Sequence, residues 1–295
     1  MSYITSIQRA IDYIEENMTN EISIEKVASE ASYSFYHFHR IFTSIMGCSV
    51  KTYIRRRRLT SAAYELNQTD KRIIEIAINY GFESQESFTR AFQQLFEVTP
   101  GKYRIEKPYL EFVGPHEISD IFSEETVISI APRIEIKDSF YVVGLEKQKL
   151  EIAGSANREQ TIRHDIPALW ESFLLNMDQI DRKVDPQVSY GIGRPTGGGI
   201  HFSYMACLEV ESPPDSIPTD MVCTSVPKGT YAVFPYHGPS QNIPKLANYI
   251  YGSWLPTTSY QLNFGVEIEV YDERWRKNDE EEMGVEIWVP IKEPI

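Results

Sequence analysis

Two sets of polar side chains, about fifty residues apart, have the chemistry needed to contact the edges of base pairs in DNA. Arginine can bond guanine through two hydrogen bonds, glutamine can bond adenine in the same way, and glutamate accepts from cytosine. Spacings of three and four residues bring the members of each set to one face of a helix. The first set is Tyr36, His39 and Arg40, and the second is Gln85, Glu86, Thr89 and Arg90.

A third set of side chains has the chemistry of a ligand site. A strand is predicted over Phe264 to Tyr271. Within it Glu267, Glu269 and Tyr271 share a face, because side chains alternate along a strand. Two carboxylates on one face are usually solvated, but beside aromatic walls they suit a hydrophobic cation through charge pairing and cation–π contact. The aromatic residues assigned to this site are Trp170, Tyr190, Tyr204, Trp254 and Tyr271.

The residues suited to DNA lie in two copies of one helical unit. The copies are related by a shift of fifty positions: Ser34, Phe38, Arg40, Phe42 and Tyr53 recur as Ser84, Phe88, Arg90, Phe92 and Tyr103. Each copy predicts a short helix, a tight turn and a second helix, which is the layout that presents a helix to the major groove.

Serines mark where the helices of each copy begin. Ser23 is the expected N-cap of a helix over Ile24 to Glu30, Ser34 caps Phe35 to Ile45, and Ser84 caps the corresponding helix of the second copy. The apolar faces of the two capped helices recur at helical spacing. They consist of Phe35, Phe38, Phe42 and Ile45 in the first copy, and Phe88, Ala91, Phe92 and Leu95 in the second.

A longer helix, roughly Ser49 to Leu66, is expected to hold the two units at a fixed separation. Gly47 is expected to end the helix before it. The run Arg55 to Arg58 suits phosphate contact, but four consecutive helical residues point in four directions, so at most two of them can face phosphates. Arg58 is expected to be structural.

Charge divides the chain into two parts. The net charge is −13, which opposes nucleic-acid binding by the chain as a whole. Residues 1–107, however, carry 14 Lys and Arg against 13 Asp and Glu, whereas residues 108–295 carry 15 against 29. Any affinity for DNA must therefore come from bases that cluster within the first part.

Composition sets the broad class. The 295 residues suffice for about two domains, and 42% hydrophobic with 24% charged residues is typical of globular proteins. Neither a run of eighteen apolar residues nor a signal-peptide core is found, so we expect a cytoplasmic protein without membrane contact. The three cysteines, Cys48, Cys207 and Cys223, are widely spaced and predict buried thiols. No metal and no cofactor is expected.

The second part has a pattern of predicted strands and helices that occurs twice. Strand-like segments over Ile130 to Glu146, Ser189 to Ile192 and His201 to Glu211 surround a helical pattern over Arg163 to Ile180. The same order returns about ninety residues later, with strand texture over Met221 to Tyr236, a helix over Ile243 to Leu255, and strands over Phe264 to Tyr271 and Val285 to Ile291. The sequence therefore predicts two strand-helix-strand-strand repeats.

The first part resembles the AraC/XylS family of bacterial transcription regulators. The resemblance covers about residues 4–107 and rests on Gly81-Phe82-Glu83-Ser84, Ser87 to Phe92, Thr99 to Arg104, Tyr53-Ile54-Arg55, Arg58-Leu59 and Ala62-Ala63. It implies two helix-turn-helix motifs on one chain that read successive major-groove faces. Two residues depart from the pattern: Glu97 stands where the family often has glycine, and Glu86 where many relatives of the Rob type carry glutamine.

The second part looks like the GyrI-like ligand-binding domain that follows AraC-type domains in Rob-like regulators. The resemblance covers about residues 129–295 and rests on Pro132-Arg133-Ile134, Val142 to Leu145, Leu169-Trp170, Tyr190-Gly191, Pro227 to Tyr236, Trp254-Leu255-Pro256, Glu269-Val270-Tyr271 and Glu286 to Ile291. Relatives bind multidrug-like cations with a pocket glutamate, which the Glu-x-Tyr motif assigns to Glu269, with Glu267 as the alternative.

These patterns predict a multidomain protein. An all-α double helix-turn-helix domain occupies residues 1–107, a linker residues 108–128, and an α+β effector-binding domain residues 129–295. The expected function is a non-enzymatic transcription regulator that binds an asymmetric promoter site in double-stranded DNA and a small hydrophobic or cationic effector. A monomer is favoured, because one chain supplies both reading helices.

Two alternatives for the second domain stay open. In one, it hydrolyses a small reactive molecule, with a buried glutamate as general base. In the other, it contacts RNA polymerase or another protein through its acidic surface. Turnover by residues 129–295, or the absence of any ligand that shifts the melting temperature, distinguishes these alternatives from effector binding.

Overall fold

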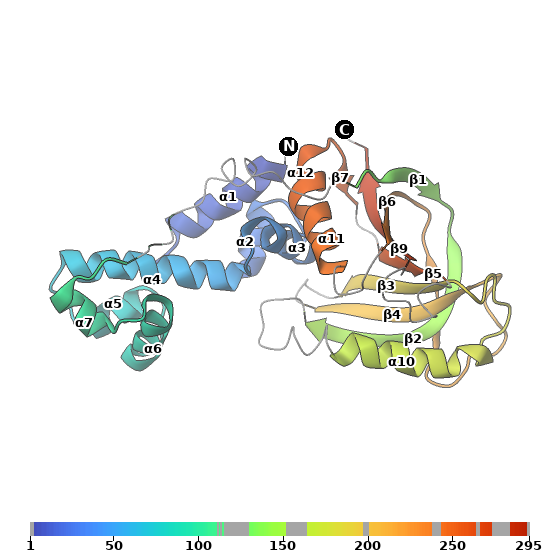
Figure 1. Cartoon of the computed structure of the whole chain (residues 1–295), viewed down its shortest axis with the longest axis horizontal. Helices are drawn as coiled ribbons and strands as arrows, with labels where there is room; N and C mark the ends of the chain where they lie inside the picture. The colour runs from blue at the N-terminus through green and yellow to red at the C-terminus, as the bar shows by residue number, and fades with distance from the viewer. Residues whose placement is uncertain are drawn as a thin grey trace. The chain divides into compact units, whose positions relative to one another are not determined.

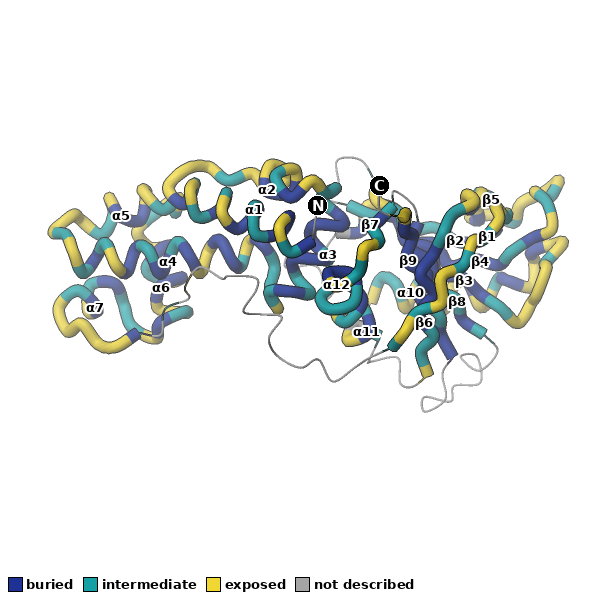
Figure 2. Tube along the Cα trace, turned by 90° about the horizontal axis from the view of Figure 1, so that it is seen from above, coloured by how far each residue is buried: buried dark blue, intermediate teal, exposed yellow. Residues whose placement is uncertain are grey.

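The structure is a computed structural model of the chain. It describes residues 3–110, 112, 114, 130–151, 164–196, 201–237, 243–263, 266–272 and 284–293. The chain divides into two compact units, Met1–Glu124 and Glu125–Ile295. Figure 1 labels the helices of the first unit and most strands and helices of the second, and Figure 2 also labels β8.

The described part of the first unit is helical, as predicted. Its helices are α1 Tyr3–Glu16, α2 Ile24–Glu30, α3 Phe35–Met46, α4 Val50–Gln68, α5 Ile73–Asn79, α6 Gln85–Phe96 and α7 Pro100–Glu106. The predicted caps are confirmed, because the hydroxyls of Ser23, Ser34 and Ser84 accept hydrogen bonds from the backbone N–H groups of Lys26, His37 and Ser87. These bonds satisfy donors that the first turn of a helix leaves unpaired.

In each of the two helix-turn-helix copies, the second helix ends on a residue in the left-handed conformation. Gly47 ends α3 with a φ of 64°, as expected. Glu97 occupies the equivalent position after α6 with a φ of 60°. A side chain in this conformation is strained by about 1 kcal/mol, because its Cβ approaches the following carbonyl oxygen. The departure from glycine noted in the sequence therefore costs stability at a helix end.

We expect Glu97→Gly to raise the free energy of unfolding by about 0.5–1 kcal/mol, since the relief of strain exceeds the greater freedom that glycine gives the unfolded chain. Urea unfolding followed by helical circular dichroism measures the change. Gln93→Gly, within α6, is the matched control and should lower stability by about 1 kcal/mol. Equal destabilisation in both variants would contradict strain at Glu97.

The second helical unit has a continuous apolar core. Residues from α4, α5, α6 and α7 form it: Leu59, Ala62, Ala63, Leu66, Ile76, Ala77, Phe88, Ala91, Phe92, Phe96 and Tyr103. Leu110 and Phe112, which fall in the predicted linker, also pack against this core, and the Phe112 ring lies 4.6 Å from that of Tyr64. Figure 2 shows buried stretches alternating with exposed ones along α4.

The four arginines of α4 divide as predicted. Arg58 is structural: its Nε donates to the Met18 carbonyl at 2.9 Å and its Nη2 to the Asn20 carbonyl at 2.6 Å. Arg57 is buried in a two-pronged ion pair with Glu15, with distances of 2.8 and 2.6 Å. Arg55 and Arg56 are exposed. Two of the four guanidinium groups therefore remain available to a phosphate backbone.

The second unit is an antiparallel sheet with helices packed on it. Its elements are β1 Arg133–Lys137, β2 Phe140–Glu151, α10 Ile166–Asn176, the 3₁₀ turn η2 Met177–Gln179, β3 Ser189–Thr196, β4 His201–Val210, β5 Val222–Val226, β6 Gly229–His237, α11 Ile243–Tyr249, the π-helical η5 Ile250–Trp254, α12 Leu255–Thr257, β7 Gln261–Leu262, β8 Glu267–Tyr271 and β9 Gly284–Lys292. The predicted strand over Phe264 to Tyr271 is described from Glu267 onward, and Phe264 lies outside the described residues.

The sheet order β1-β6-β9-β8-β3-β4-β2-β5 confirms the predicted duplication. One repeat supplies β2, α10, β3 and β4, and the other supplies β6, α11, β8 and β9. The two halves meet where β3 pairs with β8. Each half also receives a short edge strand from the other, because β1 pairs with β6 and β5 pairs with β2.

The two faces of this sheet carry different side chains. One face holds an apolar core that includes Val142, Ile192, Met205, Cys207 and Ile268. The other face carries residues one position away, among them Glu267, Glu269 and Tyr271. On this second face α10 lies against β2 and β4 (Figure 1). The junction of β3 with β8 therefore places both glutamates at the centre of the sheet, between the two repeats.

Candidate functional site

Helix α6 presents the polar face that the sequence predicts. Gln85, Glu86 and Arg90 are exposed and Thr89 is partly exposed, whereas Phe88 is fully buried on the opposite side. Hydrogen bonds from its own backbone N–H and from the Ser84 hydroxyl lower the pKa of Glu86, so this side chain is a carboxylate at neutral pH. The first two turns of α6 thus offer an amide, a carboxylate, a hydroxyl and a guanidinium to one surface.

Helix α3 differs from α6. Tyr36 and His39, which were expected on an outer face, are only 5% and 4% exposed. Every residue from Tyr36 to His39 is buried, so burial is not confined to the apolar face of this helix. The prediction of a solvent-exposed face at these two residues is therefore wrong for this structure, and their contact with DNA stays a prediction.

Arg40 is the partly exposed member of the first set. Its Nη1 donates to the Tyr36 hydroxyl at 3.0 Å, and its guanidinium lies 5.8 Å from the centre of the Tyr36 ring. The His39 Nδ1 lies 3.4 Å from the Thr43 hydroxyl. Tyr36 therefore orients Arg40, which is the α3 side chain best placed to reach a base or a phosphate.

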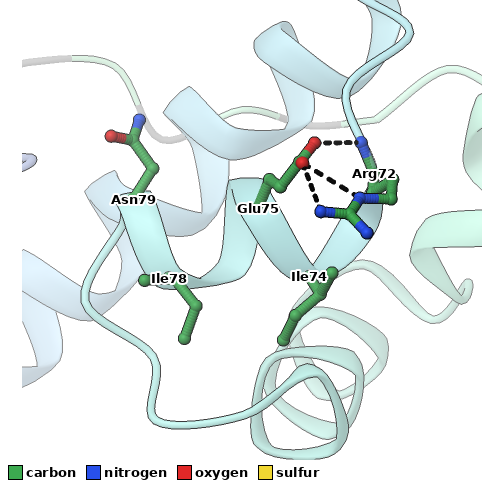
Figure 3. A pocket seen from close by; sticks show the side chains of 5 residues that line it. All are labelled: Arg72, Ile74, Glu75, Ile78 and Asn79. Atoms are coloured by element: carbon green, nitrogen blue, oxygen red, sulfur yellow. Dashed lines mark hydrogen bonds and ion pairs between the residues drawn. The ribbon is translucent and has the colours of Figure 1, made fainter.

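A surface depression of about 390 Å³ lies beside α5. Figure 3 shows its lining, which is Arg72, Ile74, Glu75, Ile78 and Asn79. Arg72 and Glu75 bond each other through the Arg72 backbone N–H at 2.9 Å and the guanidinium at 2.9 and 2.7 Å. Because these charges satisfy each other, the depression offers mainly two isoleucines. It contains none of the residues that the sequence singles out.

Glu269 is the centre of a hydrogen-bonded aromatic cluster in the second unit. Its Oε2 accepts from the Tyr204 hydroxyl and, at 2.9 Å, from the Tyr271 hydroxyl. The indole Nε1 of Trp170, on α10, donates to the Tyr204 hydroxyl at 3.2 Å, and the Trp170 ring packs edge-on against Tyr271 with centroids 4.9 Å apart. Four of the residues predicted for the site therefore meet.

The protonation of the two phenols follows from their surroundings. Burial and the adjacent Glu269 carboxylate raise the pKa of Tyr204 and of Tyr271 well above the usual range. Both phenols therefore stay neutral donors at physiological pH. Both donate to one oxygen of Glu269, so the cluster holds this carboxyl group in a defined position among aromatic rings.

Glu267 has a separate aromatic partner. This residue is 9% exposed, and its Oε1 accepts from the hydroxyl of Tyr251 on η5. The Tyr251 contact was not predicted, because it joins a helix to a strand through pairing that the linear sequence does not reveal. The second helix of the duplication thus supports Glu267, much as α10 supports the Glu269 cluster.

A glycine in β3, Gly191, makes room for the cluster. Gly191 pairs with Glu269 in the register of the sheet, and Gly193 pairs with Glu267. A Cβ on Gly191 would fall on the Tyr204 hydroxyl and lie 2.8 Å from the Glu269 Oε2. The Tyr204 phenol can reach across β3 to Glu269 only because this position has no side chain.

Tyr190 is a correction to the predicted site. It lies on the opposite face of β3 from Gly191, where its ring packs against Phe140 and Trp288. Its hydroxyl donates to Glu209 at 2.9 Å. Side-chain alternation places the glycine, not the tyrosine, beside Glu269. Tyr190 therefore does not join the cluster.

Trp254 lies on the same face as Glu269 but in a separate contact. Its ring packs edge-on against Phe234 of β6, with centroids 4.9 Å apart. Phe234 pairs with Ile287, which in turn pairs with Glu269. Trp254 therefore covers the sheet two strands away from the carboxylate.

We expect Gly191→Ala to lower the free energy of unfolding of the second unit by about 1–3 kcal/mol, because the added methyl group displaces the Tyr204 hydroxyl in a packed region. All four tryptophans of the chain lie in this unit, so tryptophan fluorescence during urea unfolding reports on it alone. Gly229→Ala, in the same unit, is the control and should cost less, because its Cβ would come no closer than 3.2 Å to the edge of the Tyr231 ring. Equal stability of Gly191→Ala and the wild type would contradict the role of this glycine.

Other chemistry is not indicated by the described residues. Among them, no group of three or more His, Cys, Asp or Glu is placed to hold a metal ion. None of the helices in the described segments has the length and apolar character needed to cross a membrane.

Two protein families match the chain. Residues 133–291, more than half of the chain, match the family described as an integron-associated effector binding protein. Residues 27–105 match a helix-turn-helix domain. Each match falls within one of the two compact units.

Individual relatives cover one or both parts. An uncharacterized HTH-type transcriptional regulator of Bacillus subtilis, YbfP, is 48% identical over 104 residues, which are 35% of this chain and 35% of that protein. The right origin-binding protein of Escherichia coli is 26% identical over 275 residues, covering 90% of this chain and 89% of that protein. A solved integron cassette protein of Vibrio cholerae is 19% identical with a TM-score of 0.41, covering 55% of this chain and 96% of its own.

Proposed function

We propose that the chain is a transcription regulator that reads an asymmetric site in double-stranded DNA and responds to a hydrophobic cation. It belongs to the AraC-type regulators of the Rob type, in which a helix-turn-helix domain is followed by an effector-binding domain of the integron-associated, GyrI-like family. The observation that carries the DNA part is the exposed face of Gln85, Glu86, Thr89 and Arg90 on α6, backed by a buried apolar face.

The geometry of the first unit supports two adjacent major-groove contacts. Helix α4 has 19 residues and connects the two helix-turn-helix copies within this unit. At a rise of 1.5 Å per residue it is about 28 Å long, comparable with the roughly 34 Å turn of DNA that separates successive groove faces. Arg55 and Arg56 on its exposed side are suited to the intervening phosphates. Because α3 and α6 carry unlike polar residues, the proposed site is asymmetric and one chain suffices to read it.

The proposal for DNA is tested by selecting duplexes from a random library and titrating the full chain with the best duplex and with a shuffled one at the same salt concentration. Specific binding should exceed binding to the shuffled duplex by about a thousandfold or more. Equal affinity for the two duplexes would remove the basis for sequence-specific regulation. The names of the relatives favour regulation over hydrolysis, and a search for turnover of candidate reactive substrates by the full chain addresses that alternative directly.

Glu86 predicts a distinctive base preference. A carboxylate at this position can accept from the amino group of cytosine, whereas glutamine bonds adenine. We expect Glu86→Gln to change the preferred base at one position of the selected site from cytosine to adenine, with a discrimination of about 1–3 kcal/mol. Titration of the wild type and of Glu86→Gln with the duplex that has cytosine at this position and with the duplex that has adenine measures the discrimination.

Glu83→Gln is the matched control for Glu86, because it removes an equal charge from the exposed turn before α6 and should leave base preference unchanged. Comparison across several duplexes distinguishes a base contact by Glu86 from repulsion between Glu86 and the phosphates. If Glu86→Gln tightens binding to every duplex equally, Glu86 acts by repelling phosphates and the proposed cytosine contact is refuted.

The proposal for the effector rests on the cluster around Glu269. A carboxylate that accepts from two neutral phenols, next to the Trp170 ring, supports binding of a cation with aromatic or apolar groups. Tetraphenylphosphonium is a suitable probe because its charge is permanent and its surface is aromatic. Its binding to the full chain should raise the melting temperature reported by tryptophan fluorescence. Contact with RNA polymerase remains a further proposal for the acidic second unit.

A further inference from the structure

Arg194, on the face of β3 opposite to the glutamate cluster, has an unusual set of hydrogen bonds. Its Nη1 donates to the hydroxyl of Thr224 on β5 at 3.1 Å. Its Nε and Nη2 are buried, and neither has a hydrogen-bond partner among the residues that the structure describes. One corner of the guanidinium is therefore held in place while the edge formed by the other two nitrogens is unsatisfied.

The same edge binds a carboxylate elsewhere in this chain. Arg57 uses its Nε and Nη2 to bond Glu15 at 2.8 and 2.6 Å. Arg72 uses these atoms to bond a single oxygen of Glu75, Oε1, at 2.9 and 2.7 Å, whereas Arg57 bonds both oxygens of its partner. The two parallel N–H groups match the two oxygens of a planar carboxylate, which makes this pairing stronger and more directional than a single hydrogen bond.

A further donor lies on the same face of the strand. Thr196 is two residues beyond Arg194, so the side chains of these two residues project to the same side at a separation of about 7 Å. The Thr196 hydroxyl is also buried and also lacks a partner within the described segments. Two neighbouring side chains on one face thus leave three buried polar atoms unsatisfied.

The neighbouring thiol of Cys207 does not supply a negative charge that would compensate Arg194. Burial raises the pKa of Cys207, although the positive charge of Arg194 acts in the opposite direction. The thiol is therefore neutral at physiological pH. On the same face, Ile192 and Met205 are apolar and fully or almost fully buried. A buried guanidinium edge without hydrogen bonds is unfavourable, so an anion at this edge would be strongly favoured.

We propose that Arg194 and Thr196 form a second ligand site, which binds a small organic carboxylate through the Arg194 Nε and Nη2 atoms and the Thr196 hydroxyl. Arg194 and the Gly191–Glu269 pair lie on opposite faces of β3, so one small ligand cannot contact both sites through the sheet. The second unit would therefore bind a cation on one face and a carboxylate on the other, and this second site is independent of the proposed regulatory function.

The test uses the full chain and sodium acetate as the probe, with sodium chloride and sodium phosphate at the same ionic strength. Tryptophan fluorescence reports the melting temperature of the second unit alone. Acetate should raise this temperature saturably in the wild type, and chloride should not. Arg194→Met should lose the response, whereas Arg182→Met, which removes an exposed arginine bonded to Asp215, should retain it.

Three results would overturn the proposal. They are an equal response to acetate and chloride, a response that survives in Arg194→Met, and tighter binding of phosphate than of acetate. If Arg194→Met fails to fold, Thr196→Val decides the matter, since it keeps the guanidinium and removes only the hydroxyl. It should weaken acetate binding several-fold by isothermal titration calorimetry, and unchanged binding in Thr196→Val would exclude the site as proposed.

Discussion

Arg90→Ala should weaken binding of the full chain to its selected duplex by about 1–3 kcal/mol, which is about 5- to 150-fold. Arg90 is exposed on the polar face of α6, one turn beyond Gln85 and Glu86. A guanidinium there can bond the two acceptors of guanine, and alanine removes both hydrogen bonds. Fluorescence anisotropy at a series of salt concentrations measures the loss.

The salt series distinguishes a base contact from a phosphate contact at Arg90. A base contact predicts weaker binding to the selected duplex, little change for a shuffled duplex, and an unchanged dependence on salt. A phosphate contact predicts uniform weakening and a salt slope smaller by about one. Arg182→Ala removes the same charge from the second unit and should have no effect on either duplex. An Arg90→Ala variant with wild-type affinity and specificity would exclude α6 as the reading helix in the proposed orientation.

The helical unit could be predicted closely from the sequence because its signals are local. Ser34 and Ser84 begin their helices through hydrogen bonds within three residues, and the spacing of Phe88 and Phe92 defines the buried side of α6. Exposure of the α6 face follows from this apolar face. The same reasoning failed at Tyr36 and His39, because a polar position opposite an apolar face is exposed only if nothing else packs on it.

The second unit was less predictable because its contacts are non-local. The duplication follows from the order of strand and helix patterns, but the exchange of β1 and β5 between the halves depends on pairing over about ninety residues. Tyr190 was assigned to the wrong face because the alternation within β3 fixes only relative directions until the pairing with β8 is known. The role of Gly191 was missed for the same reason.

Glu269→Gln should lower the affinity for tetraphenylphosphonium by about 2 kcal/mol, or about 30-fold, in isothermal titration calorimetry with the full chain. The amide oxygen can still accept from the Tyr204 and Tyr271 hydroxyls, so the substitution removes the negative charge while it preserves the shape of the cluster. The expected loss is smaller than the full attraction between two charges in a protein interior, because the free carboxylate and the free cation are both solvated before binding.

Charge, not shape, must account for this loss if Glu269 is the effector residue. Triphenylphosphine oxide, which is neutral and has three phenyl rings, should bind the wild type and Glu269→Gln equally. Glu209→Gln is the matched variant, because Glu209 also accepts from a tyrosine hydroxyl, that of Tyr190, but lies on the opposite face of the sheet. It should retain binding of the cation. If Glu269→Gln retains it as well while Glu267→Gln loses it, the cation lies beside Tyr251 and the second repeat, and the Glu-x-Tyr assignment is wrong by one alternation of the strand.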